Sequence, residues 1–428
     1  MPERENKLSA ASMKQQLLTQ RFSNGLVLLG EHMPWLRSSA FTFLIPAGTC
    51  YEPPDLCGLG SLACEMSQRG CGPYDSRAFL EELDFLGVER TSSISTHHTS
   101  FSCAMPSSAF ERTLELYAEM VRRPRLPRDQ LEDSRQLALQ DLRALEDEPT
   151  HRCFNELKRF RFPTPYGRTA QGTVEGLQAI EIQDVRDFCE NNFHAVDSIL
   201  AVAGNFDWLA VCDAVERTLG DWRGTVTPKL PPLVARNGQH HTDHASNQTH
   251  LALAYACDPY ESPDYYKTRA LVGILSDGMS SRLFTEVREK RGLVYSVFAT
   301  CFSLAGQGSV FCYAGTTTNR AEETLQVLLE TIQSLAEGVS EDELARLKVR
   351  IKSALVMEQE SSAARSHQIA GDWFHLGRVP SREEVLQEID SLTCESLLAH
   401  FTAHRPKSFS LVTVGSQPLE FPSGIVDA

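Results

Sequence analysis

Four cysteines recur at a fixed spacing near the start of the chain, and regularly spaced thiols can mark a metal site or a disulfide framework. Each is seven residues from the next: Cys50, Cys57, Cys64 and Cys71. The Pro53-Pro54 pair and Gly58 interrupt any continuous helix through all four. None of the twelve cysteines forms a C-x-x-C pair, so zinc ribbons and redox motifs have no support. We therefore expect these thiols to pack like small hydrophobic groups.

The histidines form two further groups of candidate metal ligands. His97 and His98 are adjacent in a Thr- and Ser-rich segment that predicts a strand, so their side chains should face opposite sides of a sheet. His240, His241 and His244 fall in a polar stretch that we interpret as an exposed connection. Neither arrangement brings ligands together on one ion, and we predict no metal bound by this chain.

Composition places the chain among ordinary globular proteins. Its 428 residues are 42% hydrophobic and 23% charged, which excludes disordered, collagen-like and disulfide-miniprotein classes. At roughly 100–200 residues per domain, this length allows about two to four domains. The formal net charge of −15 argues against a nucleic-acid partner. The one basic cluster, around Arg122 and Arg128, we interpret as a solvated loop after a helix.

The sequence also predicts no contact with membranes. No apolar run approaches the roughly 18 residues that a spanning helix requires. The first 16 residues carry charges but lack the apolar stretch of a secretory signal. We therefore expect a cytoplasmic protein whose cysteines are reduced thiols.

Proline and turn signals divide the chain into two halves. Residues 227–236 begin with a proline-rich run, TPKLPP, that neither a helix nor a central strand accommodates. They separate an N-terminal domain, residues 1–226, from a C-terminal domain, residues 237–428. In the first half, Ser23-Asn24-Gly25 predicts a hairpin turn. The strands predicted there are 15–21, 26–31, 40–47, a pair within 88–105, and 198–203. The predicted helices are 59–68, 76–86, 109–122 and 128–146.

The second half repeats this order of elements. Residues 250–256 and 307–313 predict strands, 268–275 predicts a helix, and 320–337 and 340–360 predict two successive long helices. Both halves also end alike, with Ile182-Gln183-Asp184 before a buried strand in one and Ile389-Asp390-Ser391 in the other. This indicates an internal duplication of an α+β unit of about 200 residues. Helices packed on a mostly antiparallel sheet are the expected architecture.

Three segments carry a specific resemblance. Residues 44–67 are LIPAGTCYEPPDLCGLGSLACEMS, residues 164–180 are TPYGRTAQGTVEGLQAI, and residues 280–297 are SSRLFTEVREKRGLVYSV. They resemble the pitrilysin/insulinase-like zinc metallopeptidases, a family that includes mitochondrial processing peptidase and the core proteins of respiratory complex III. The likeness covers nearly the whole chain in the right order. It implies two similar α+β domains that face each other across a cleft.

The resemblance also shows what is altered. In that family H-x-x-E-H on a helix supplies two zinc-binding histidines and a general base, and a distal Glu completes the site. The matching positions in this chain are Ser61, Cys64, Glu65 and Asp141. A serine hydroxyl is a poor zinc ligand at neutral pH, and a thiol cannot replace the basic carboxylate. Cys64 and Glu65 also point about 100° apart on a helix, so we expect the zinc site to be lost.

A second set of family positions is retained. The resemblance implies that Arg288 and Tyr295 bind the substrate and stabilise the transition state. Residues 281–291 predict a helix, Gly292 a helix stop and 293–300 a strand, which would project both side chains from one junction. The resemblance further implies that peptide adds as a strand beside Thr91, Ser92 and Ser93. Arg90 and Thr91 depart from the Asn-Ala pair usual at that edge.

Three hypotheses follow. The first is a non-catalytic, peptide-binding subunit that lends Arg288 and Tyr295 to the active site of a zinc-bearing paralogue, or acts as a self-dimer. Zinc is then expected in the partner, and the net negative charge suits basic peptides. The second is a structural or assembly protein similar to the complex III core subunits. The third is a stand-alone peptidase with an unorthodox metal site.

Overall fold

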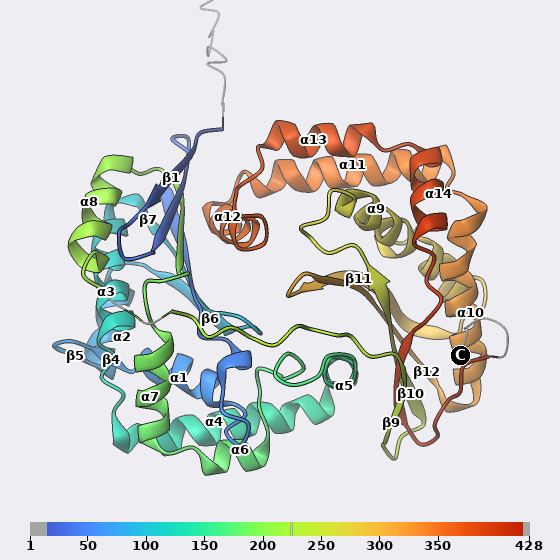
Figure 1. Cartoon of the computed structure of the whole chain (residues 1–428), viewed down its shortest axis with the longest axis horizontal. Helices are drawn as coiled ribbons and strands as arrows, with labels where there is room; N and C mark the ends of the chain where they lie inside the picture. The colour runs from blue at the N-terminus through green and yellow to red at the C-terminus, as the bar shows by residue number, and fades with distance from the viewer. Residues whose placement is uncertain (1–14, 223, 225, 423–428) are drawn as a thin grey trace, which may run out of the picture.

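Two α+β units make up the chain, each with its own sheet and covering helices (Figure 1). The computed structural model describes residues 15–222, 224 and 226–422. Residues 1–14, for which the sequence predicts no signal peptide, lie outside this part. The predicted fold, two α+β domains related by duplication, is confirmed.

The first unit is built on a six-stranded sheet with the order β1-β2-β8-β3-β7-β6. Its strands are β1 (Leu17–Arg21), β2 (Val27–His32), β3 (Ser38–Ile45), β6 (Glu89–Ile94), β7 (Thr99–Pro106) and β8 (Ile199–Gly204). β2 pairs with β8 in parallel, and the other neighbours pair antiparallel. The predicted hairpin joins β1 to β2 at Gly25, whose φ of 94° favours glycine.

The second unit is built on a five-stranded sheet with the order β11-β12-β10-β13-β9. Its strands are β9 (Gly238–Asp243), β10 (Gln248–Cys257), β11 (Val294–Leu304), β12 (Gln307–Thr317) and β13 (Ser410–Gly415). β9 pairs with β13 in parallel and the other neighbours pair antiparallel. The series β9-β13-β10-β12-β11 therefore repeats β2-β8-β3-β7-β6 in order and direction, as a duplication requires.

Strand β9 corrects one prediction. The segment with His240, His241 and His244, expected as an exposed connection, forms the edge of the second sheet. Its backbone partner is β13, more than 160 residues away in sequence, which no local pattern reveals. His240 stacks on Phe160 at 5.8 Å between ring centroids, and His241 Nδ1 lies 2.8 Å from Thr413 Oγ1.

Helices cover both sheets. The first unit contains α1 (Leu59–Ser67), α2 (Ser76–Phe85), α3 (Phe110–Arg122), α4 (Leu131–Ala144), α5 (Pro149–Arg161), α6 (Val174–Ala179), α7 (Ile182–Asn192) and α8 (Trp208–Leu219). The second contains α9 (Tyr265–Ser276), α10 (Ala321–Gln333), α11 (Glu341–Glu358), α12 (Ser362–Leu376), α13 (Arg382–Ser391) and α14 (Cys394–Ala403). A π-helical segment, η5 (Phe284–Glu289), precedes β11, and a small hairpin joins β4 (Gly70–Cys71) to β5 (Tyr74–Asp75). None of the helices in the described chain has the length and apolar character needed to cross a bilayer.

One helix of each unit packs on the sheet of the other unit. Helix α5 packs on β10 and β13 of the second sheet, and α12 packs on β3 and β8 of the first sheet (Figure 1). Leu157 of α5 belongs to an apolar cluster with Ala252 and Val412, whereas Ile369 of α12 belongs to one with Leu29 and Ala201. The two units are therefore joined through buried apolar contacts as well as through the segment that connects them.

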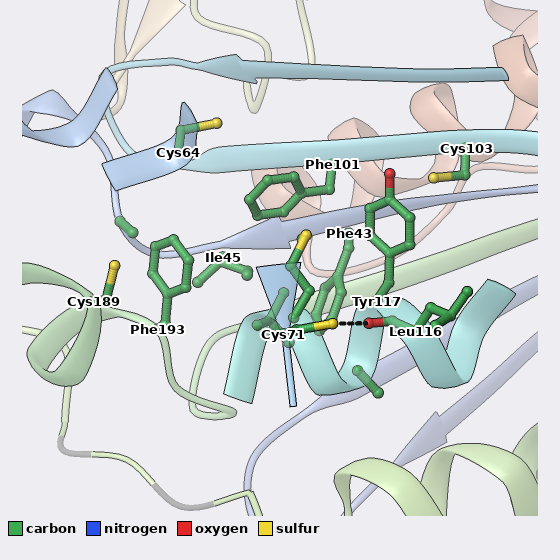
Figure 2. Close-up of a cluster of buried hydrophobic side chains, with 14 of the residues drawn as sticks. Phe43, Ile45, Cys64, Cys71, Phe101, Cys103, Leu116, Tyr117, Cys189 and Phe193 are labelled. Atoms are coloured by element: carbon green, nitrogen blue, oxygen red, sulfur yellow. Dashed lines mark hydrogen bonds between the residues drawn. The ribbon is translucent and has the colours of Figure 1, made fainter. Parts of the chain in front are cut away.

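The main core of the first unit contains several thiols. Figure 2 shows those of Cys64, Cys71, Cys103 and Cys189 near aromatic rings that include Phe101 and Tyr117. All twelve cysteines are free. For Cys64 and Cys71 the expected role as small buried hydrophobic groups is confirmed.

Candidate functional site

Helix α1 holds the first set of candidate positions, and a buried carboxylate fixes its start. Glu52, only 4% exposed, accepts a hydrogen bond from the Gly60 backbone N–H at 2.9 Å. Burial raises the pKa of Glu52 to about 7. Sequence reasoning did not single out Glu52, although an acidic residue shortly before a predicted helix is a candidate partner for its N-terminal N–H groups.

Two of the four positions of the altered zinc motif have partners within the chain, one is buried and one is exposed. The Ser61 hydroxyl donates to the Ala170 carbonyl, and Glu65 pairs with Arg69 at 3.1 Å. Cys64 is 5% exposed, and burial raises the pKa of its thiol to about 12, so it stays protonated at neutral pH. Asp141 is exposed on α4.

These side chains do not fit a zinc ion. Zinc needs deprotonated or neutral donors gathered within a few ångströms. In the described part of the chain, Cys64, Glu65 and Asp141 do not bring their ligand atoms within 4.8 Å of one another. Helix α1 therefore offers no metal site for a catalytic step.

The His97-His98 pair requires a correction. Both lie in the turn between β6 and β7 rather than in a strand, because Ser95 closes this turn by accepting a hydrogen bond from the His98 N–H at 3.0 Å. Both rings contact Phe374 of α12, with centroid distances of 5.7 and 4.3 Å. Burial lowers the pKa of His97 to about 4 and that of His98 to about 3, so both are neutral packing groups.

Thr91, Ser92 and Ser93 lie on β6, at the edge of the first sheet. Within the described chain β6 pairs only with β7, and these three residues are exposed. Ser92 Oγ accepts a hydrogen bond from Gln68 Nε2 at 2.9 Å, which joins the strand to the end of α1. The free side of β6 therefore offers backbone groups for an added strand.

Arg288 and Tyr295 lie where η5 leads into β11, the corresponding edge of the second sheet. Arg288 is exposed on the π-helical segment, with its guanidinium 5.0 Å from the Phe284 ring centroid, and makes no ion pair with any described residue. Tyr295 is 75% exposed and is the unpaired residue of a β-bulge between Val294 and Ser296. The predicted α-helix over 281–291 is thus mostly π-helix. π-Bulges and β-bulges are both frequent at functional sites.

One half-buried ion pair anchors the segment that carries Arg288. Arg282 makes two bonds to the Glu343 carboxylate, at 2.7 and 3.0 Å, and also donates to Ser334 and Gly338 carbonyls. The bonds from Arg282 hold the pKa of Glu343 at about 2. The start of η5 is therefore tied to α11 of the same unit.

Replacing Arg282 with alanine is expected to lower the free energy of unfolding by about 2 kcal/mol at neutral pH, because a charge-assisted hydrogen-bond network is lost. The folded-state pKa of Glu343 lies below its ordinary 4.5, so this stabilisation is present above pH 4.5 and disappears as the pH falls toward 2. Urea denaturation of both proteins at several pH values measures the difference in their free energies of unfolding. If that difference does not change with pH, the aliphatic part of Arg282 stabilises the fold by packing and its charge does not contribute.

The two candidate strands are equivalent. β6 and β11 are the last strands of the duplicated series, and both lie toward the middle of the molecule (Figure 1). One edge carries the predicted peptide-binding residues and the other carries Arg288 and Tyr295.

Comparisons with known proteins agree with this architecture. The family model described as insulinase (peptidase family M16) matches residues 27–173, and that of the peptidase M16 inactive domain matches residues 179–350. An uncharacterized zinc protease of Rickettsia felis is 25% identical over 406 residues, which cover 94% of this chain and 98% of that protein.

Solved structures share the fold. A peptidase M16 inactive domain from Pseudomonas fluorescens gives a TM-score of 0.86 at 21% identity, over 95% of this chain and 99% of that one. A chain of complex III from Candida albicans gives 0.80 at 19% identity, over 94% and 96%.

Proposed function

The chain belongs to the pitrilysin/insulinase-like peptidase family M16, and from this we propose that it is a non-catalytic, peptide-binding subunit of a zinc-dependent peptidase. It contributes Arg288 and Tyr295 to the active site of a zinc-bearing paralogue. Zinc is held by that partner and not by α1 of this chain.

One contrast carries the proposal. Ser61, Cys64 and Glu65 have intramolecular contacts that do not fit zinc, whereas Arg288 and Tyr295 are exposed on irregular backbone. A guanidinium and a phenol can donate hydrogen bonds to a scissile carbonyl as negative charge develops on its oxygen. The chain thus retains the groups that stabilise a transition state, but it lacks the groups that bind zinc and activate water.

Peptide binding is proposed at the free edge of β6. An extended peptide gains affinity there from main-chain hydrogen bonds, and the exposed Thr91 and Ser93 leave the edge uncovered. The net charge of −15 favours basic peptides over acidic ones. The twelve free cysteines suit a reducing compartment such as the cytoplasm.

Two proline substitutions test the edge of β6. Successive backbone N–H groups of a strand point alternately to its two sides, here to β7 and to the free side. Of the variants Thr91→Pro and Ser92→Pro, one therefore loses a hydrogen bond to β7, and the other loses a free N–H group that could bind the peptide. The variant that keeps the wild-type Tm is expected to bind a labelled basic peptide about tenfold more weakly, as loss of one hydrogen bond implies. Fluorescence anisotropy measures this affinity. Unchanged affinity in both variants would place peptide binding elsewhere.

The likeness to a complex III chain favours one second candidate, a structural or assembly protein. It predicts no peptide affinity and stable partners that are not peptidases. Affinity purification of the native chain followed by mass spectrometry separates the two functions. Recovery of a homologue with intact H-x-x-E-H supports the peptidase subunit, and recovery of non-peptidase proteins alone supports assembly.

A further inference from the structure

Three potential metal ligands meet on the second unit, away from β6 and β11. Asp258 follows β10, His400 lies in the last turn of α14, and His404 ends that helix. Their ligand atoms all lie within 4.8 Å of one another, and no other group of this kind occurs in the part of the chain that the structure describes. Two histidines four residues apart lie on one helical face, which is a usual way to present two imidazoles to one ion.

Neighbouring groups orient two of the three ligands. Asp258 accepts hydrogen bonds from the Ser262 hydroxyl at 2.9 Å and the Thr268 hydroxyl at 3.1 Å. His404 Nδ1 lies 3.1 Å from the His400 carbonyl, which can only accept, so Nδ1 carries the proton and Nε2 offers its lone pair. Such outer hydrogen bonds accompany most metal-binding histidines and carboxylates.

The spacing suits a tetrahedral ion. Two ligands that each lie 2.0–2.1 Å from one tetrahedral zinc are about 3.3 Å apart. His400 Nε2 lies 3.3 Å from Asp258 Oδ2. His400 is 7% exposed, so its imidazole is held in place within the protein. The exposed His404 supplies the third ligand, with water at the fourth position.

We propose that Asp258, His400 and His404 bind one Zn²⁺ ion that fastens α14 to the segment between β10 and α9. Helices α14 and α9 pack side by side at this point (Figure 1). In the absence of the ion, His400 Nε2 bonds to Thr268 Oγ1 at 3.0 Å, and zinc takes the place of the Nε2 proton. Imidazole and carboxylate ligands with an open position are those that zinc accepts in proteins.

Zinc content of the loaded protein tests the proposal. The full chain is incubated with zinc chloride and desalted, and its zinc is counted by mass spectrometry; about one ion per chain is expected. His404→Ala should remove it, because His404 is exposed and its loss leaves the fold intact. His367→Ala, an exposed histidine on α12, is the matched control and should retain it. Zinc at wild-type level in His404→Ala, or no zinc in wild type, overturns the proposal.

A thermal shift gives a second measure. Excess zinc should raise the Tm of wild type and of His367→Ala by several degrees, and should leave that of His404→Ala unchanged, because only the folded site binds the ion. Equal shifts in all three proteins would contradict the site. This inference does not depend on the proposed function, since peptidase activity of the mixed complex is expected to be the same in His404→Ala. Conversely, zinc that persists in His404→Ala but disappears in Glu65→Ala would point to an unorthodox site on α1 and a stand-alone peptidase.

Discussion

Replacing Arg288 with alanine is expected to lower the peptidase activity of a complex with the zinc-bearing paralogue by about 100- to 1,000-fold, the usual effect of losing one donor to a developing oxyanion. The fold should not change, because Arg288 is exposed and makes no ion pair with a described residue. The two purified proteins are mixed and their kcat/KM is measured on a basic peptide. Because the donor acts mainly in the transition state, kcat should fall more than KM rises.

Matched variants make this result specific. Tyr295→Phe removes only the phenolic hydroxyl and should lower kcat/KM by at least about tenfold, as loss of a single hydrogen bond implies. Arg346→Ala removes another exposed arginine, on α11, and should leave activity within about twofold. Activity unaffected by both Arg288→Ala and Tyr295→Phe would refute the peptidase-subunit function.

The duplication of the α+β unit could be predicted because most of its apolar strands are recognisable in the sequence, whereas the order of the strands in each sheet comes from the structure alone. β2, β3, β8, β10 and β13 are buried along most of their length, so their β-branched and apolar runs stand out locally. The edge strand β9, GQHHTD, carries no such run, and its place in the sheet depends on pairing with the distant β13. The polar strand β9 is therefore where the sequence was least informative about the sheets.

The candidate site was only partly predictable for a related reason. The resemblance placed Arg288 and Tyr295, but a 3.6-residue period does not distinguish the π-helix under Arg288 from an α-helix, and the bulge at Tyr295 depends on pairing with β12. The partner of Ser61, the Ala170 carbonyl, is likewise remote in sequence. Such contacts follow from packing rather than from local pattern.

The exchange of α5 and α12 between units also escaped prediction, because each helix packs on a sheet from the other half of the chain. Its polar centre is Arg365 of α12. The guanidinium donates to Glu31 of β2 at 2.5 and 3.0 Å and to Glu358 at 3.0 Å. The side chains of Arg365 and Glu31 are 9% and 4% exposed. This ion pair therefore links the first sheet to the second unit in a nearly dry environment.

Replacing Arg365 with alanine is expected to lower the free energy of unfolding by about 3–5 kcal/mol, because Glu31 would keep a buried charge without its partner. The matched control is Arg378→Ala, whose pair with Glu384 is 58% and 42% exposed and should change stability by less than about 1 kcal/mol. Urea denaturation of the three proteins measures both changes.

A double substitution distinguishes two contributions to the free energy of unfolding: the destabilisation by an unpaired buried charge, and the stabilisation by the ion pair itself. In Glu31→Gln/Arg365→Met no buried charge is left at Glu31, so most of the lost stability should return relative to Arg365→Ala. If the double variant is as unstable as Arg365→Ala, the pair itself stabilises the exchange of α12. If Arg365→Ala is no less stable than Arg378→Ala, the apolar contacts of Ile369 and Ala370 with the first sheet hold α12 without help from charge.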